Sequence, residues 1–341
     1  MSPFIIRPAR EDDLPSLVAL AKEAGTGMTT VPQGEDAMAE RINASIAAFA
    51  GKGRASARDV FFFVMEDEEG AAGMACIFPN LGEDRPFYSY RLSHLATQAP
   101  EMNLTASTDI LFLVNDFHGY TEVGTLLVAA RARGKGAGRF LSLSRFMYLG
   151  MNPSRFSDKV MAEIRGHFEE DGTCPFWEHI AAKFFNTSFE EADRQSANDF
   201  RFISHLMPKF PIYVSLLPQS CQDIIGKPHR TSNHALNLLS SEGFKWTRCV
   251  DIFDGGPSIE TDLSDIRTVR KQSKRTLTVK ADASHIDGAV PFMVAAQGDQ
   301  PYVVTMGMGH PTGQTVVIPP EIARRANLAN GQSVIAAPLK G

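Results

Sequence analysis

The fold is decided by residues 122–138, which read EVGTLLVAARARGKGAG. The apolar start of this stretch, Glu122–Ala130, predicts a β-strand, and the residues that follow it, Arg139–Met151, predict a helix. The glycines between these elements let the backbone turn sharply and approach a ligand closely, because glycine has no Cβ. The N-terminus of a helix also directs unpaired N–H groups and a positive dipole end at an anion. The stretch therefore predicts a pyrophosphate-binding loop.

Two familiar phosphate-binding motifs do not match this loop. A Walker loop ends in Gly-Lys-Ser/Thr, which the sequence lacks. A Rossmann fingerprint opens the first strand–helix unit of its domain, whereas this loop follows about five predicted strands. The spacing instead resembles the acyl-CoA loop of the GCN5-related N-acetyltransferase superfamily, Arg/Gln-x-x-Gly-x-Gly/Ala, at Arg133, Gly136 and Gly138.

The segments around the loop predict a mixed α/β (α+β) fold. Residues 81–104 are predicted to be a loop. The other elements follow the order of the same superfamily, so we expect an acyl-CoA N-acyltransferase-like domain. They are a strand at 4–6, helices at 14–24 and 35–50, a hairpin at 60–66 and 72–78, strands at 109–115 and 122–130, the helix at 139–151, a strand at 159–163 and a helix at 175–185.

The length of 341 residues exceeds that of one typical domain. We expect an acyl-CoA N-acyltransferase-like domain at 1–195, a helix and strand extension at 196–270, and a small β-rich unit at 271–341. Six cations and no acid occur in Arg267–Lys280, which predicts a solvated connector.

The composition predicts a soluble, cytoplasmic protein. The net charge of −5 disfavours a surface that coats nucleic acid or an anionic membrane. The longest strongly apolar run, Val60–Met65, is too short to span a bilayer, and the N-terminus does not have the pattern of a signal peptide. The cysteines are too far apart for a zinc or redox motif, so we predict no metal site and four reduced structural thiols, at Cys76, Cys174, Cys221 and Cys249.

Several longer segments resemble the bacterial arginine N-succinyltransferases, over about residues 3–270. The resemblance is specific, because the fold alone does not require these strings, and it is loose after residue 270. It implies transfer of a succinyl group from succinyl-CoA to the α-amine of L-arginine. The segments are LFLVND (111–116), RFM (145–147), DKVMAEIRG (158–166), PFW (175–177), LMPKFPIY (206–213), IGKPH (225–229) and VDIFDGGP (250–257).

The resemblance also implies how succinyl-CoA is held. In the superfamily, the strand before the loop splays from its neighbour, so that backbone N–H groups within Glu122–Val128 can hold the thioester carbonyl. An amine attacks, a tetrahedral oxyanion forms, and the thiolate leaves. Succinyl-CoA is expected as a co-substrate, with no permanently bound cofactor. The residues expected to contact it are Leu126, Val128, Arg133, Gly134, Gly136 and Gly138.

The same resemblance makes His229 the catalytic proton donor. Imidazole is the side chain best suited to move a proton near neutral pH. Pro228 restrains the backbone before it, and the positive end of the helix that follows would lower the pKa of the ring. His234, one helical turn farther on, is the nearest alternative, and a surface or structural role is the alternative for either histidine.

Recognition of arginine requires carboxylates for its guanidinium and cations or N–H groups for its own carboxylate. Succinyl-CoA carries a terminal carboxylate as well, which Arg91 or Arg165 could hold. Each candidate could instead be an ordinary surface residue or a buried hydrogen-bonding one. The residues expected to bind the substrate are Tyr90, Arg91, Asp116 and Glu163.

Two alternatives to this function stay open. One is an N-acyltransferase of the same fold that acts on ornithine or another amine. The other is a DNA-binding or regulatory protein, because residues 315–334 resemble the strand–proline–helix–glycine unit of swapped-hairpin regulators, although Arg324 and Arg325 offer few phosphate contacts. Related chains work as paired α and β subunits, so we expect a homo-oligomer or a pair with a homologous subunit, and no nucleic-acid or membrane partner.

Overall fold

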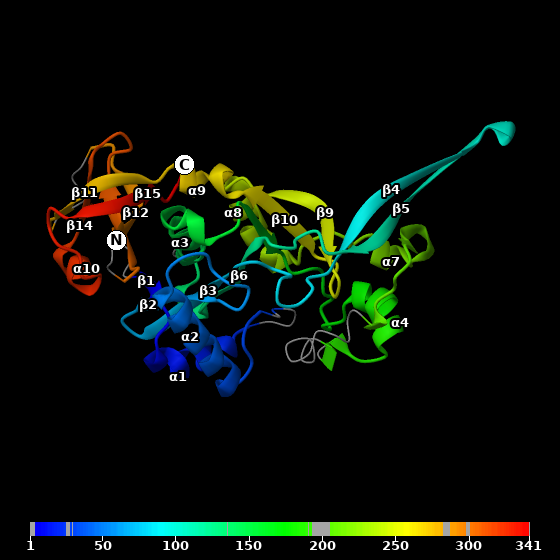
Figure 1. The fold of residues 1–341 in the computed structure, drawn as a ribbon, viewed down its shortest axis with the longest axis horizontal. Coiled ribbons are helices and arrows are strands. Elements are labelled where there is room, and N and C mark those ends of the chain that lie inside the picture. Colours follow the sequence, from blue (N-terminus) through cyan, green and yellow to red (C-terminus); the bar gives the residue numbers. More distant parts are fainter. Residues whose placement is uncertain are drawn as a thin grey trace.

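The computed structural model describes residues 4–24, 28, 30–134, 136–189, 191–192, 205–281, 287–297 and 301–340. Within these residues, 15 strands form one continuous sheet. In chain order they are β1 (Ile5–Pro8), β2 (Phe61–Asp67), β3 (Gly70–Phe78), β4 (Ser89–Ala99), β5 (Leu104–Val114), β6 (Thr121–Val128), β7 (Lys159–Glu163), β8 (Ile212–Tyr213), β9 (Lys245–Asp251), β10 (Pro257–Asp262), β11 (Ser273–Val279), β12 (Val290–Ala296), β13 (Val304–Gly309), β14 (Thr315–Ile318) and β15 (Ser333–Pro338). Their order across the sheet is β12-β15-β11-β14-β13-β1-β2-β3-β6-β7-β10-β9-β4-β5-β8 (Figure 1).

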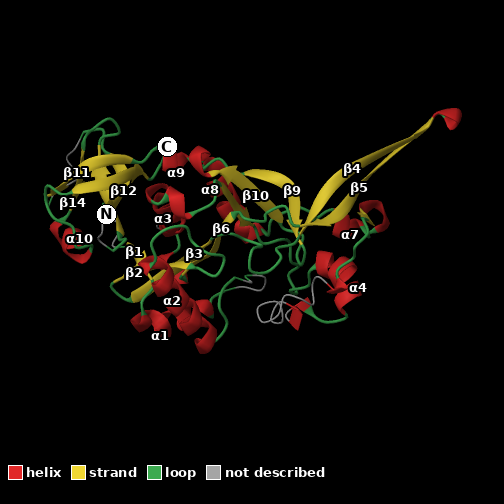
Figure 2. Ribbon diagram, in the orientation of Figure 1, coloured by secondary structure: helices red, strands yellow, loops and turns green. Residues whose placement is uncertain are grey.

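The helices lie around this sheet (Figure 2). The predicted helices at 35–50 and 139–151 are confirmed, the second beginning two residues earlier than expected. The helix predicted at 175–185 is a π-helical turn, Trp177–Ala181, that continues into a short α-helix. The α-helices are α1 (Leu14–Ala21), α2 (Glu35–Ala50), α3 (Ala137–Met151), α4 (Ala182–Phe185), α7 (Gln219–Gln222), α8 (Asn233–Ser241), α9 (Arg267–Arg270) and α10 (Pro320–Arg325).

The strands next to the glycine loop are buried on both faces. Successive side chains of a strand point to opposite sides of the sheet. Phe61 and Phe63 of β2 accordingly pack in the cluster that contains α3, and Phe62 and Val64 pack in the cluster that contains α1 and α2. A strand covered on both faces has no need of polar residues along its length, which explains the unbroken apolar run of β2. This arrangement, with β6, the loop and α3 in sequence, confirms the expected mixed α/β, acyl-CoA N-acyltransferase-like fold.

The predicted loop at residues 81–104 is wrong in its second half. β4 begins at Ser89 and pairs with β5 from Ser89↔Val114 to Ala99↔Leu104, forming a long arm that projects from the body (Figure 1). Tyr90 and Leu92 at its base are buried, but residues 93–99 are exposed or half-buried on both faces. A strand without a buried face shows no alternation of polar and apolar residues, so the sequence gives no strand signal here.

The five C-terminal strands close into a small barrel. β12 pairs with both β15 and β13, which completes the ring β12-β15-β11-β14-β13. The solvated connector predicted at Arg267–Lys280 is therefore wrong, because it contains α9 and the barrel strand β11. Arg275 of β11 is buried and donates to the carbonyl oxygens of His310 and Pro311 at 2.8 and 2.9 Å. The hairpin-like tail at 315–334 supplies β14 and α10 and reaches β15, and β14 and β15 both pair with β11.

The barrel is attached to α3 and to the start of the sheet. The Tyr302 hydroxyl is buried and donates to the carbonyl oxygen of Ser144 in α3 at 2.6 Å. Gln272 Nε2 donates to the carbonyl oxygens of Phe146 and Met147 at 3.3 and 3.1 Å. One further pairing joins β13 to β1. The barrel and the acyltransferase-like part are thus held together through the backbone of α3.

Three further expectations concern the chain as a whole. All four cysteines are free and buried, and burial raises the pKa of the Cys174 thiol to about 12.

The boundary expected at 195–196 lies outside the described residues, and the division into three domains stays a prediction. Among the described helices, none has the length and apolar character needed to cross a membrane.

Gly256→Ala tests the tight packing after β9. An added Cβ would overlap the carbonyl oxygen of Ile164 and lie 2.6 Å from the amide nitrogen of Gly166, so the backbone must shift. Overpacking of this kind costs about 1–3 kcal/mol in the free energy of unfolding, measured by urea titration. Gly51→Ala is the control, because its Cβ would make ordinary contacts of 3.4 Å or more. Equal stability of the two variants would contradict the argument.

Candidate functional site

Strands β6 and β7 run parallel and then separate. Their pairing covers only Thr121↔Val160 and Glu122↔Met161, although β6 continues to Val128. The backbone groups of β6 that face β7 beyond this pair therefore have no partner in β7. The expected splay of the strand before the glycine loop is confirmed by this pairing.

A β-bulge lies in the separated part of β6. Thr125 and Leu126 together lie opposite a single residue of β3, and Thr125 has a φ of 52°, a left-handed conformation that is rare for a β-branched residue. The Thr125 hydroxyl donates to the carbonyl oxygen of Thr30 at 3.1 Å, which helps to hold this conformation. Both bulge residues form part of a cavity wall beside the diverging strands.

The glycine loop is open toward solvent at the start of α3. Gly134 and Gly136 have φ angles of 79° and 76°, and no atom lies within 4 Å of the position that a Cβ would take at either residue. Within the described residues, no side chain caps α3, so its first N–H groups are available to an anion. Arg133 Nε donates to the carbonyl oxygen of Val128 at 3.0 Å, and Gly138 lies against the Val128 side chain. The structure thus brings the predicted loop residues together at the end of β6, where they contact Val128, two residues after Leu126.

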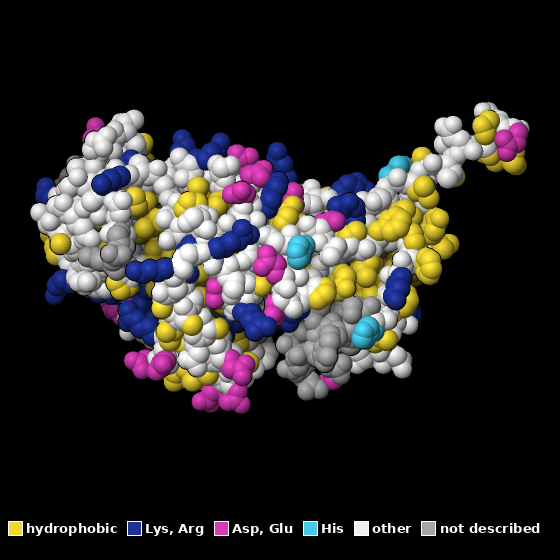
Figure 3. Space-filling model, in the orientation of Figure 1, with side chains coloured by type: hydrophobic (Ala, Val, Ile, Leu, Met, Phe, Trp, Pro, Cys, Tyr) yellow, Lys and Arg dark blue, Asp and Glu magenta, His cyan; other side chains and the backbone are white. Residues whose placement is uncertain are grey.

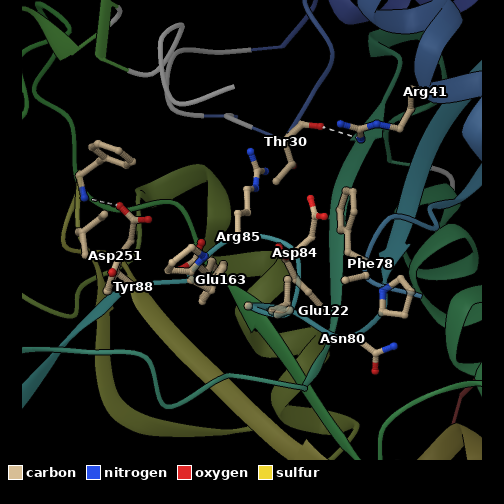
Figure 4. Close-up of a pocket in the computed structure, with 18 residues that line it drawn as sticks. Thr30, Arg41, Phe78, Asn80, Asp84, Arg85, Tyr88, Glu122, Glu163 and Asp251 are labelled. Atoms are coloured by element: carbon tan, nitrogen blue, oxygen red, sulfur yellow. Dashed lines mark hydrogen bonds between the residues drawn. The ribbon is translucent and has the colours of Figure 1, made fainter. Parts of the chain in front are cut away.

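Two cavities lie beside the diverging strands. The first, of about 270 Å³, is bounded by α2 and by the loop after β3, from which Asp84 and Arg85 extend (Figure 4). The second, of about 260 Å³, lies between β6, β7 and α8 and includes Leu126 in its wall. The residues common to both are Thr30, Glu122, Glu163, Asp251 and Phe253.

Glu122 and Glu163 are two buried carboxylates on neighbouring strands. Glu122 pairs with Met161, and Glu163 is two residues farther along β7, so both side chains lie on one face of the sheet. Glu122 is 6% exposed, and neither carboxylate has a hydrogen-bond or ion-pair partner among the described residues. Burial raises the pKa of Glu122 to about 7 and that of Glu163 well above its ordinary value. A bound cation would stabilise their charged forms.

Asp251 and Asp254 fix the backbone next to Glu163. Asp251 accepts hydrogen bonds from the amides of Phe253 and Asp254 at 2.7 and 2.8 Å. Asp254 accepts them from the amides of Gly166 and Gly256 at 2.7 and 2.8 Å. Burial raises the pKa of both groups, and the charge of Asp251 raises that of Asp254 further. These bonds tie the turn after β9 to the end of β7.

His229 lies two residues before Thr231, which lines the second cavity. Its amide donates to the carbonyl oxygen of Arg165 at 2.8 Å, and Pro228 forms a single bridge with Gly166. Nδ1 of the ring accepts the Thr231 amide at 3.2 Å, which leaves the proton of the neutral ring on Nε2. Burial lowers the pKa of His229, as do nearby Arg165 and Arg230. Neither His229 nor the alternative, His234, lines either cavity; His229 is half-buried and His234 is exposed.

The four residues predicted to bind the substrate do not lie together. Glu163 lines both cavities. Tyr90 is buried in a hydrophobic cluster with Phe176, and burial raises the pKa of its hydroxyl. Arg91 and Asp116 form an ion pair with each other in a third cavity, of about 520 Å³, which shares no lining residue with the other two. The roles of these residues stay predictions.

Sequence analysis missed Glu122 and Arg145, which both line the second cavity. Glu122 could have been found from the sequence, because it is the one acid in an otherwise apolar predicted strand. Arg145 is one of two cations in the predicted helix 139–151, and it lies among the buried residues of that helix. In the described part of the chain, no group of three or more His, Cys, Asp or Glu side chains is placed to hold a metal ion.

Comparison with known proteins agrees with this geometry. Residues 4–268 match the family model described as Arginine N-succinyltransferase beta subunit. The chain is 34% identical over 338 residues to the arginine N-succinyltransferase subunit beta of Pseudomonas aeruginosa, with 98% of each chain covered. It is 38% identical over 296 residues to an arginine N-succinyltransferase of Escherichia coli, with 86% of this chain and 85% of that protein covered.

A solved structure shows the same likeness over the whole chain. The arginine/ornithine succinyltransferase subunit AI from Pseudomonas aeruginosa superposes with a TM-score of 0.88 at 26% sequence identity, and the match covers 100% of both chains. The splayed strands, the glycine loop and these matches lead to one conclusion: the chain belongs to the arginine N-succinyltransferase family.

Proposed function

We propose that the chain transfers the succinyl group of succinyl-CoA to the α-amine of L-arginine. The observation that carries this proposal is the second cavity, which lies where β6 and β7 diverge and is lined by Glu122 and Glu163. Its wall contains both the strand segment suited to hold a thioester and groups suited to hold a cation. The names of the relatives, all arginine succinyltransferases, support the same reaction.

Succinyl-CoA is the proposed co-substrate. Its pyrophosphate would bind the free N–H groups at the start of α3, with Arg133, Gly134, Gly136 and Gly138 around it. The thioester carbonyl would accept a hydrogen bond from the unpaired backbone of β6 near Leu126. The same donors would stabilise the oxyanion that forms when the amine attacks, and they do so without reorganisation because the sheet holds them in place.

Glu122 and Glu163 are the proposed partners of the arginine guanidinium. A guanidinium binds carboxylates through paired, charge-assisted hydrogen bonds, and these two carboxylates lack other partners among the described residues. Burial opposes their ionisation, and a bound cation offsets this penalty. Because Glu122 precedes the thioester segment on the same strand, a long cationic side chain bound here would bring its α-amine toward Leu126.

His229 is the proposed proton carrier. The neutral ring would accept a proton from the attacking amine and deliver it to the departing CoA thiolate, which restores the neutral ring. The two neighbouring arginines lower the pKa of His229, so the neutral form predominates near pH 7 and the imidazolium is a stronger acid than usual.

A panel of amines tests the reaction. Purified protein is expected to release CoA from succinyl-CoA fastest with L-arginine and more slowly with ornithine, whose shorter cationic side chain lacks the fork of the guanidinium. Release is followed with a thiol reagent. Turnover with ornithine alone would move the assignment to that substrate, and no turnover with any amino acid would contradict the proposal.

Glu163→Gln tests the acceptor site within the same assay. Loss of the charge is expected to raise the KM for arginine by about tenfold or more, with the KM for succinyl-CoA unchanged. Glu40→Gln, at an exposed position on α2, is the matched control. Equal KM values for arginine in the two variants would remove Glu163 from substrate binding.

His229→Ala is expected to keep the fold and CoA binding and to lose most of its turnover, by about 100-fold or more. The unchanged fold is checked by thermal unfolding, and CoA binding by calorimetry. Because the His229 side chain bonds only locally with Thr231 in the described structure, its removal leaves the surrounding strands intact. Near-normal turnover would exclude His229 from the mechanism and leave His234 as the candidate proton donor.

We also propose that the chain works as an oligomer, by pairing with a second copy of itself. One relative is named as a subunit. Figure 3 shows hydrophobic side chains gathered around the base of the β4–β5 arm. Phe210 and Leu216, on either side of β8, which pairs with β5, are 84% and 83% exposed. The arm tip carries two more exposed apolar side chains, Met102 and Leu104. A two-stranded arm is marginally stable in water by itself and gains most from a partner.

Size-exclusion chromatography with light scattering tests this assembly. The wild-type chain is expected to elute as a dimer or larger species, and Leu216→Glu to shift toward the monomer with the same thermal stability per chain. A monomeric wild type would contradict self-pairing, and a complex formed only with a homologous subunit would support the mixed assembly instead.

A further inference from the structure

Two arginines in the second cavity have no ion-pair partner among the described residues. Arg145 comes from α3 and Arg165 follows β7, so they approach the cavity from different elements. Buried cations in proteins are normally paired with anions, because removal of the charge from water is costly. Two such cations beside one cavity indicate that an anion binds there.

Arg145 is the more deeply buried of the two, at 1% exposure. Its guanidinium donates to three neutral oxygens: the carbonyl oxygen of Gly124 at 2.9 Å, the Ser142 hydroxyl at 3.0 Å and the Ser142 carbonyl oxygen at 3.3 Å. A guanidinium has five N–H donors, so this set leaves donor capacity for a further acceptor. Burial lowers the pKa of Arg145 to about 10, although the charge of Glu122, which lines the same cavity, acts in the opposite direction.

Arg165 also lines the cavity. Its Nε is buried without a hydrogen-bond partner in the described structure, and its guanidinium lies 4.7 Å from the centre of the Phe168 ring. The ring fixes the plane of the guanidinium without neutralising it. The carbonyl oxygen of the same residue accepts the His229 amide, so Arg165 is positioned next to the proposed proton carrier.

We propose that Arg145 and Arg165 form a carboxylate-binding subsite that selects the substrates of this cavity. The inference rests on the proposed function and adds a specificity site to it. Two carboxylates would reach the cavity in that reaction: the terminal carboxylate of the succinyl group and the α-carboxylate of the amino acid. The bond of Arg145 to Gly124, two residues before Leu126 on β6, favours the succinyl group, whose carboxylate lies only a few bonds from the thioester.

The subsite explains why a dicarboxylic acyl donor would be preferred. An acetyl group in the same position would leave both guanidinium groups unpaired in the cavity. A site built around buried polar groups rejects a ligand that lacks their partner far more strongly than an apolar pocket rejects a smaller ligand. Glu122 and Glu163 would thus bind a cationic group, and Arg145 and Arg165 would bind a carboxylate, in one cavity.

The test compares three substrate pairs in wild type, Arg165→Met and Arg145→Lys. The pairs are succinyl-CoA with arginine, acetyl-CoA with arginine, and succinyl-CoA with agmatine, which is arginine without its carboxylate. Arg165→Met is expected to lower the ratio of kcat/KM for succinyl-CoA to kcat/KM for acetyl-CoA, both measured with arginine, by about tenfold or more. A change that acts through the pKa of His229 affects both reactions and cancels in this ratio. Arg145→Lys keeps the charge but loses the fork, and it is expected to reduce the same preference.

The three substrate pairs show which of the two carboxylates the subsite binds. If the loss disappears with acetyl-CoA, the subsite binds the donor, and if it disappears with agmatine, the subsite binds the amino acid. Arg324→Met, an exposed arginine of α10, is the control for removal of a positive charge. A uniform loss with all three pairs, or no loss with any of them, would overturn the subsite.

Calorimetry makes the subsite testable even if the wild type does not turn over arginine. Wild-type protein is expected to bind succinyl-CoA more tightly than acetyl-CoA, or arginine more tightly than agmatine, and Arg165→Met to lose that difference. Equal affinities in the wild type would contradict the subsite. An absence of turnover together with a retained affinity difference would contradict the proposed reaction alone.

Discussion

The early end of the pairing between β6 and β7 is the constraint on which the rest of the site depends. A parallel pair normally satisfies the facing N–H and C=O groups along its whole length. Here the ladder stops at Glu122, and the bulge at Thr125 keeps the two strands apart. The core around β2, β3 and α3 is buried on both faces and holds the opening rigid. A ligand can therefore meet preorganised backbone donors within a packed domain.

Charge is distributed unevenly around this opening. Carboxylates from β6 and β7 and guanidinium groups from α3 and the end of β7 line one cavity without forming ion pairs with each other in the described residues. Each of these charges would be more stable in water, so the free protein carries an electrostatic cost that a bound group of opposite charge would offset. The affinity gained in this way would depend on the charges of the substrates, so the site would discriminate between ligands by their charge.

The sequence predicted the parts of the fold that have strong periodic or glycine signals. The helix after the glycine loop, the apolar hairpin and the splayed strand are examples, and all follow from burial on defined faces. The arm strand at Ser89–Ala99 was not predictable, because its distal half has no buried face. For the site, the loop residues and Glu163 were found from motif and resemblance. Glu122 and Arg145 were missed. Glu122 has a sequence signal, as the one acid in an apolar strand, but only tertiary packing shows that its side chain and that of Arg145 line one cavity.

The hydrogen bond from Tyr302 to the carbonyl oxygen of Ser144 has a consequence for how this protein can be divided. Ser144 immediately precedes Arg145, so the C-terminal barrel holds the same helical turn that carries a guanidinium into the cavity. A shortened protein without the barrel would expose the apolar face of α3 and leave this turn free to fray. The barrel therefore supports the site structurally, and the two parts of the chain depend on each other for their folded state.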